Sequence, residues 1–306
     1  MDYLTGILST YYALIPVTLA QSLILAFVVL GIMIPFRMLS FPDLTSEGAY
    51  PLGGCVCGVM LAAGANPVLA ILVAICAGFI AGFCTAFIHL RFRIHTLLAG
   101  ILMTTMLYSI NLRIMGRSNL SVFGTDSVFG WAPFAAGSPA ARIFIAGIIA
   151  ALVFAALLYY FRTEKGTAVR AVGSNPDMAE AQGINVWAAT IGGVGAASAF
   201  AALSGALMVQ AQGFADVNMG LGILINGLAA LMIGEAITGK QTVLRQLAAP
   251  FVGAIVYYQL VSLCLAAGMP PPDLKLATGL FVLAMLALPS LTSRRGPRAA
   301  RETIRE

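Results

Sequence analysis

The sequence is dominated by apolar stretches of about 20 residues that are separated by short polar segments. A helix of that length crosses the ~30 Å hydrocarbon core of a bilayer. Of the 306 residues, 60% are hydrophobic and 9% are charged. Soluble domains carry about 25% charged residues, and an aqueous fold of this length would not hide so much apolar surface. The sequence therefore predicts an all-α, polytopic membrane protein.

The apolar stretches predict nine membrane helices with two unusual members. The second and seventh are short and open with glycine, proline or polar residues. Short, Gly- or Pro-interrupted segments in a transporter often lie at its pathway, so we expect short or broken helices there. The nine predicted spans are 14–36, 45–64, 67–91, 95–114, 141–161, 187–212, 220–238, 245–268 and 273–293.

Basic residues predict the orientation of these spans, because Lys and Arg are enriched in cytoplasmic loops. With the C-terminus inside and the N-terminus outside, 13 of the 17 basic residues lie inside and 4 outside. The opposite orientation reverses this ratio. The inside set is Arg37, Arg91, Arg93, Arg162, Lys165, Arg170, Lys240, Arg245, Arg294, Arg295, Arg298, Arg301 and Arg305, and the outside set is Arg113, Arg117, Arg142 and Lys275.

The polar segments complete the predicted organisation of the chain. Residues 1–293 form the transmembrane domain. Within it, residues 115–140 form an extracytoplasmic segment that we expect to be a partly ordered cap, and residues 162–186 form a cytoplasmic segment. Residues 294–306 form a basic cytoplasmic tail.

The cytoplasmic segment contains a short predicted helix, residues 176–182, with sequence signals at both ends. Asn175 is a good N-cap, Pro176 suits the first helical position, and Asp177 complements the positive helix end. Gly183 is a good C-terminal stop. An isolated helix of this length is unstable in water, so the membrane domain or a partner protein must hold it. An ordinary capped connector is the simpler alternative.

Three stretches resemble one transporter family. Arg170–Asn185, which reads R-A-V-G-S-N-P-D-M-A-E-A-Q-G-I-N, resembles the cytoplasmic loop of ABC permeases of the branched-chain amino acid and ribose type. Leu39–Ala49 is similar to the D-L-S-x-G stretch that precedes a membrane helix in that family. Gly234–Gly239, followed by Gly253 and Ala254, falls where the family carries G-G-x-x-x-x-G-G and then a G-A pair. This stretch departs most, because Glu235 stands in place of the second glycine.

The resemblance implies the permease architecture of an ABC importer in a bacterial plasma membrane. In the family the cytoplasmic loop docks on a separate ATPase. The other implied partners are a periplasmic or lipid-anchored solute-binding protein and a second permease copy, within membrane lipid. The resemblance is greatest to the subgroup that works with tryptophan-type or uncharacterised binding proteins, which implies an amino acid or aromatic metabolite as solute. The implied ATPase-coupling residues are Ser174, Asn175, Pro176, Asp177, Glu180 and Gly183.

No enzymatic site is predicted in this chain. Gly234–Lys240 nearly matches a phosphate-binding P-loop, but Gln241 stands where Ser or Thr must hold magnesium, and no strand precedes the segment. We therefore expect no cofactor here, with ATP and magnesium on the partner ATPase. Catalytic motifs are absent from the sequence, and the net charge of +5 follows from the placement of Lys and Arg, so no nucleic acid partner is expected. The cysteines (Cys55, Cys57, Cys76, Cys84 and Cys264) are interpreted as small apolar residues.

Polar residues inside the predicted spans are candidates for the solute path, because such groups need a partner or water in hydrocarbon. We single out Gln210 and Asn226, together with Glu47 and Glu235 near the inner ends of two spans. Hydrogen bonding between helices is the alternative. Two other functions stay open, namely an ion-coupled secondary transporter that uses Glu47 or Glu235 and a membrane-embedded enzyme. The scarcity of deep charges counts against the first, and the lack of a reactive cluster against the second. The remaining neutral polar residues are Gln21, Thr104, Thr105, Asn111, Gln212 and Gln259.

Overall fold

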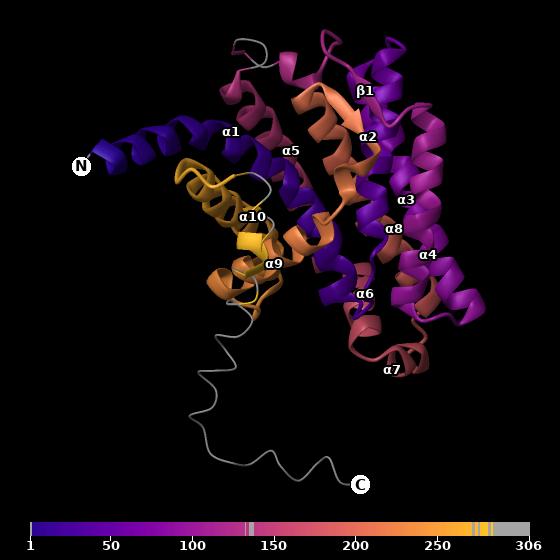
Figure 1. Cartoon of the computed structure of the whole chain (residues 1–306). Helices are drawn as coiled ribbons and strands as arrows, with labels where there is room; N and C mark the ends of the chain where they lie inside the picture. The colour runs from indigo at the N-terminus through magenta and orange to yellow at the C-terminus, as the bar shows by residue number, and fades with distance from the viewer. Residues whose placement is uncertain are drawn as a thin grey trace, which may run out of the picture.

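The structure is a computed structural model that describes residues 2–131, 133–134, 138–270, 273–274, 276–280 and 283. Its described part is a bundle of long helices with short cap and loop elements at both ends (Figure 1). The helices are α1 (Asp2–Met33), α2 (Thr45–Ala62), α3 (Pro67–Phe92), α4 (Thr96–Met115), α5 (Pro139–Arg162), α6 (Glu164–Ser174), α7 (Pro176–Ala181), α8 (Val186–Gln212), α9 (Ile223–Thr238) and α10 (Val243–Ala266).

The first eight predicted spans are found as helices, and most of the ninth, 273–293, lies outside the described residues, as does the predicted tail at 294–306. Seven helical segments in the described part are long and apolar enough to cross a membrane. Of the eight predicted spans found as helices, the one that is not among these seven is α2, which has 18 residues and is mostly buried within the bundle. The all-α, polytopic prediction is therefore confirmed, with the count of nine only approximate.

Close packing around α8 depends on small residues. A side-chain carbon at Gly78 or Gly82 of α3 would collide with α8, at Ala202 and at the Val194 carbonyl oxygen respectively. Gly53 of α2 and Gly205 of α8 lie just as close to the facing backbone. Membrane helices associate through such small-residue contacts because lipid provides no hydrophobic drive between them. α8 consequently lies in the middle of the bundle, with 72% of its most apolar segment buried.

The first helix changes form at its end. α1 continues into the π-helix η1 (Ile34–Met38), and an irregular segment at 39–44 then leads to α2. Ser40 in this segment has φ = 50°, a conformation that a non-glycine residue rarely adopts. The expected break in the second span thus lies before the helix, because Thr45–Ala62 is continuous through Pro51.

Residues 115–140 contribute one strand to a small sheet that the sequence did not predict. Strand β1 (Asn119–Ser121) pairs antiparallel with β2 (Phe214–Asp216), which follows α8. The 3₁₀ helices η2 (Val128–Trp131) and η3 (Val217–Gly220) lie beside it. Three-residue strands carry too little alternation to be recognised in sequence. The pairing links two loops far apart in the chain at the end of the bundle opposite α7 (Figure 1).

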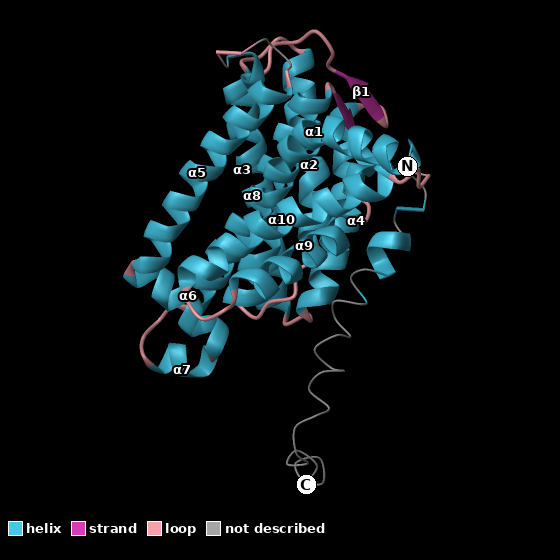
Figure 2. Ribbon diagram, turned by 90° about the vertical axis from the view of Figure 1, so that its left-hand side faces the viewer, coloured by secondary structure: helices cyan, strands magenta, loops and turns pink. Residues whose placement is uncertain are grey.

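Residues 162–186 also differ from expectation. The predicted seven-residue helix is six residues long, Pro176–Ala181, and does not stand alone. It is preceded by α6, whose Val169 and Val172 are buried. Gly173 of α6 lies against the backbone of Met38 and Leu39, where any side chain would collide. Together α6 and α7 form a projection below α5 (Figure 2). The membrane domain therefore holds the short helix. This is one of the two supports expected from the sequence, the other being a partner protein.

Candidate solute path and coupling segment

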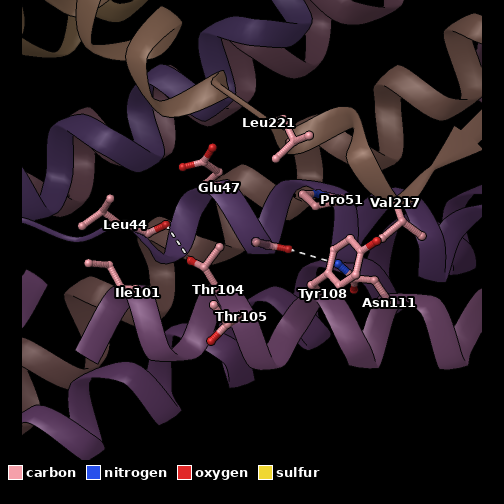
Figure 3. Close-up of a pocket in the computed structure, with 12 residues that line it drawn as sticks. Leu44, Glu47, Pro51, Ile101, Thr104, Thr105, Tyr108, Asn111, Val217 and Leu221 are labelled. Carbon is pink, nitrogen blue, oxygen red and sulfur yellow. Dashed lines mark hydrogen bonds between the residues drawn. The ribbon is translucent and has the colours of Figure 1, made fainter. Parts of the chain in front are cut away.

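A cavity of about 280 Å³ lies between α2, α4 and the η3 turn, and it is lined mostly by apolar and hydroxyl side chains (Figure 3). α4 contributes Thr104, Tyr108 and Asn111, which are spaced so that they share one helix face. Only Thr104, Thr105 and Asn111 were recognised in the sequence as polar residues of this span, and Tyr108 was missed. The complete lining is Leu44, Glu47, Gly48, Pro51, Ile101, Thr104, Thr105, Tyr108, Asn111, Val217, Gly220 and Leu221.

The start of α2 is held by a buried carboxylate that sequence analysis passed over. Asp43 is fully buried, and its Oδ1 accepts from the backbone N–H of Thr45 at 2.9 Å and from the Thr45 hydroxyl at 2.5 Å. The Thr45 hydroxyl also lies 2.8 Å from that of Thr85 in α3. Thr104 of α4 donates to the Leu44 carbonyl oxygen at 3.0 Å. These bonds satisfy irregular backbone at membrane depth, which is tolerated only inside protein or beside water.

Glu47 connects this cavity to the beginning of α9. Its Oε1 accepts from the backbone N–H of Gly222 at 2.9 Å. Gly222 has φ = 82° and is the N-cap residue of α9, so the carboxylate lies at the positive end of that helix. Glu47 is the only carboxylate or cationic side chain among the cavity residues. The cavity thus combines an apolar wall, several hydroxyls and one acidic group.

The other two central candidates do not line this cavity. Gln210 is buried, its Oε1 accepts from the Val128 N–H at 2.9 Å, and its Nε2 donates to the Pro67 carbonyl oxygen at 3.2 Å. Its amide therefore links α8 to η2 and to the start of α3, where it also borders a separate cavity of about 170 Å³. Asn226 lies on α9 one turn after Gly222 and is half-buried. A role for either residue in the path stays a prediction.

Glu235 lies at the opposite end of α9 and forms a charged cluster. Arg37 of η1 donates to both of its carboxylate oxygens, each at 2.6 Å. The Lys240 ammonium lies 2.9 Å from Oε2. The Glu235 side chain is 6% exposed, compared with 42% for Arg37 and 59% for Lys240. This bidentate geometry is the strong form of a charge-assisted hydrogen bond. The family glycine that Glu235 replaces would leave Arg37 without this partner.

The predicted coupling residues form one exposed surface. The Asn175 side chain accepts from the Met178 N–H at 3.0 Å, and Gly183 has φ = 80°, which confirms the predicted helix cap and stop. All six residues, Ser174, Asn175, Pro176, Asp177, Glu180 and Gly183, are exposed. The segment is thus a capped projection whose surface is open to a partner.

The long helices, the irregular segment before α2 and the exposed capped helix define a membrane permease. The chain belongs to the family described as "Branched-chain amino acid transport system / permease component", which it matches over residues 15–288. It is 38% identical over 273 residues to a tyrosine transport system permease protein of Clostridioides difficile, covering 89% of this chain and 90% of that protein. It is 33% identical over 280 residues to an uncharacterized protein of Rickettsia prowazekii, covering 88% of this chain and 95% of that protein. No solved structure matches this chain.

Proposed function

We propose that this chain is the membrane-spanning subunit of an ATP-driven importer and that α7 couples it to a separate ATPase. One observation carries the proposal, namely that a capped helix too short for independent stability is held at the membrane surface with its polar residues exposed. Met178, between Asp177 and Glu180, is 64% exposed. An apolar side chain flanked by two carboxylates suits a protein partner, because methionine is enriched at protein interfaces.

The ATP site itself is expected on the partner. The segment that resembles a P-loop, Gly234–Lys240, consists of the last turn of α9 and the two residues that follow it rather than a loop after a strand. Its lysine pairs with Glu235 rather than pointing toward an open phosphate site. ATP and magnesium therefore belong to a separate subunit in this proposal, and this chain supplies the path and the docking surface.

Charge distribution supports a cytoplasmic location for α7 and an extracytoplasmic N-terminus. Of the 11 basic residues in the described part, eight lie at the α7 end of the bundle and three at the other end. This is the asymmetry of the positive-inside rule. The α7 set is Arg37, Arg91, Arg93, Arg162, Lys165, Arg170, Lys240 and Arg245, and the opposite set is Arg113, Arg117 and Arg142.

The solute that we propose is an amino acid with an aromatic or large apolar side chain. The relative named for tyrosine transport favours this class. The cavity beside α4 fits it as well, because its apolar wall suits the side chain and Glu47 is placed to meet an ammonium group. Within the described residues, one Glu47 oxygen is engaged, by the Gly222 N–H. We expect selection to reside mainly in a solute-binding protein, with this cavity providing a weak site that releases its solute.

We further propose that two permease copies enclose the path. The cavity opens where α4 presents Ile101 and Tyr108, which are 48% and 50% exposed. A face that combines a hollow with polar groups is a poor surface for lipid, and a second copy with twofold symmetry would cover it. The ion-coupled alternative is less supported, because Glu235 is held by two cations and Glu47 caps a helix.

The proposal is tested by Asp177→Arg in the complete importer reconstituted with its ATPase and binding protein. Reversing the charge at the positive end of α7 should abolish most solute uptake while assembly and basal ATP hydrolysis persist. Asp126→Arg, the same change at an exposed position on the opposite face, is the matched control and should leave coupling unchanged. Normal assembly with wild-type uptake in Asp177→Arg would remove Asp177 from the coupling surface. Uptake driven by an ion gradient without the ATPase would overturn the importer itself.

A further inference from the structure

An apolar cavity of about 290 Å³ separates α5 from α8 on the side away from the α2–α4 cavity. It is bounded by two facing stripes at four-residue spacing, Val153, Leu157 and Phe161 on α5 and Gly192, Ala196 and Phe200 on α8. A side-chain carbon added at Gly192 would meet no atom within 4 Å. The cavity is therefore real open space between two membrane helices.

The depth of this cavity matches one leaflet of a bilayer. Val153 lies nine residues before Arg162, the last residue of α5, which is about 14 Å along the helix at 1.5 Å per residue. Half of the hydrocarbon core is about 15 Å thick. An apolar cavity stays free of water, so a chain of membrane lipid is the occupant that this geometry favours.

A second cavity adjoins the first where α5 ends and α6 begins, and it carries charged side chains among a mostly apolar lining. It has a volume of about 480 Å³ and shares Tyr160 and Val169 with the apolar cavity. Lys165, Glu164 and Asn185 line it, where α6 leaves α5 and α8 begins. The two neighbouring cavities place an apolar interior next to a mouth with charged side chains, which is the layout that an acyl chain and its headgroup require.

The charge around this mouth favours an anionic headgroup. Lys165 lines the cavity, and Arg162 is exposed at the adjacent end of α5. The Nη2 of Arg170 donates weakly to the Phe161 carbonyl oxygen at 3.5 Å, and its buried Nε has no partner in the described part of the chain. Between Arg162 and Arg170 the chain carries three cations and one carboxylate, that of Glu164, and of these Lys165 and Glu164 line the cavity. Basic residues near an anionic membrane surface attract its headgroups.

We propose that this space binds an anionic phospholipid, with one acyl chain between α5 and α8 and its phosphate near Lys165. The lipid would fill the gap that α5, α6 and α8 leave at the base of the α6–α7 projection (Figure 2). The proposal requires only that the chain lies in a bilayer, so its test does not depend on the transported solute or the ATPase.

The test uses the full chain in nanodiscs that contain phosphatidylglycerol with a photoactivatable diazirine in one acyl chain. After illumination, mass spectrometry should locate the label on the facing stripes of α5 and α8. Gly192→Leu, which fills the cavity, should lower this labelling at least about fivefold, equivalent to about 1 kcal/mol. Gly147→Leu is the matched control, because a side chain at Gly147 on α5 also meets no atom within 4 Å but lies outside the cavity. It should leave the labelling unchanged.

Separate measurements examine the headgroup and the competing occupants. Phosphatidylcholine with the same photoactivatable chain should label the stripes at least about threefold less, and Lys165→Gln should remove that preference. Free glycerol phosphate should not compete, because it lacks the acyl chain. Uniform labelling of all lipid-facing helices, equal labelling by both lipids, or competition by glycerol phosphate would overturn the proposal. A disulfide between two copies of Gly192→Cys would also overturn it, by showing that a second permease covers this face.

Discussion

The two ends of α9 are both held by glutamates, but in opposite ways. At the start of the helix, Glu47 accepts one backbone N–H and faces a cavity of hydroxyl and apolar groups. At the other end, Glu235 accepts three contacts from Arg37 and Lys240 and is 6% exposed. One carboxylate keeps unused acceptor capacity beside open space, whereas the other is neutralised.

This difference separates anchoring from solute contact. A buried carboxylate without counter-charges is costly, so a fully paired one such as Glu235 is suited to fix helix positions. A carboxylate with one neutral donor and a cavity beside it is suited to exchange partners as a solute passes. The two residues were equivalent candidates in the sequence, and only their surroundings distinguish them. Substitutions of Glu235, Glu47 and Asn226 test this interpretation.

The largest effect on stability is expected from Glu235→Gln. The amide keeps the shape of the side chain but removes the charge that pairs with Arg37 and Lys240. Hydrogen bonds to charged groups contribute about 1.5–3 kcal/mol, and the partial exposure of both partners reduces this, so we expect a loss of about 2 kcal/mol. Reversible unfolding of the purified chain in mixed micelles measures it.

Lys240→Gln is the control for this measurement. The lysine side chain is 59% exposed, so its removal should cost less than about 1 kcal/mol. Glu47→Gln should also cost less than about 1 kcal/mol, because the amide oxygen can still accept from the Gly222 N–H. Equal losses in Glu235→Gln and Glu47→Gln would erase the distinction between the two ends of α9.

For solute uptake we expect the reverse order, with a larger effect from Glu47→Gln than from Glu235→Gln. Glu47→Gln removes the only carboxylate of the cavity and should lower uptake of an amino acid about tenfold, equivalent to about 1.4 kcal/mol, because the solute ammonium loses its counter-charge. Binding-protein-dependent uptake into proteoliposomes measures this at a fixed amount of assembled complex.

Thr105→Val is the matched control in the same cavity. The Thr105 hydroxyl donates to the Leu102 carbonyl oxygen of its own helix at 2.8 Å, so its loss leaves the cavity shape unchanged. Uptake should then fall much less than in Glu47→Gln. If both variants transport at the wild-type rate, the solute does not pass beside this part of α4.

Sequence reasoning succeeded where long patterns carry the signal. Eight spans and the capped helix after Asn175 follow from length, apolar content and cap residues, and all appear in the structure. The strand pair Asn119–Ser121 with Phe214–Asp216 did not, because three residues are too few to show a period and their pairing is long-range. α6 was also missed, since its buried positions Val169 and Val172 make too short an apolar face.

The candidate site shows a sharper limit. Glu47 was identified as a polar residue near the path, but nothing local indicated that it caps a helix 175 residues away. Gln210 was equally prominent in the sequence, yet its amide is occupied by Val128 and Pro67. Polarity in a membrane helix predicts that a partner exists, and only the folded structure identifies that partner. The hydrogen bond from the Thr45 N–H to the Asp43 carboxylate is local, so a side-chain turn at this position could have been predicted from the sequence.

The smallest expected effect concerns Asn226, which lies on α9 between the two glutamates and one turn from the Glu47 end. A neutral amide binds a passing solute weakly, so Asn226→Leu should lower uptake about threefold, less than Glu47→Gln, while assembly and basal ATP hydrolysis persist. Asn226→Cys should react with a small water-soluble thiol reagent in at least one state of the ATPase cycle, because α9 begins beside the cavity. Protection in every nucleotide state, in a well-folded protein, would place position 226 in a helix–helix contact. The path would then be confined to the α2–α4 side of Gly222, and Glu47 would mark its edge.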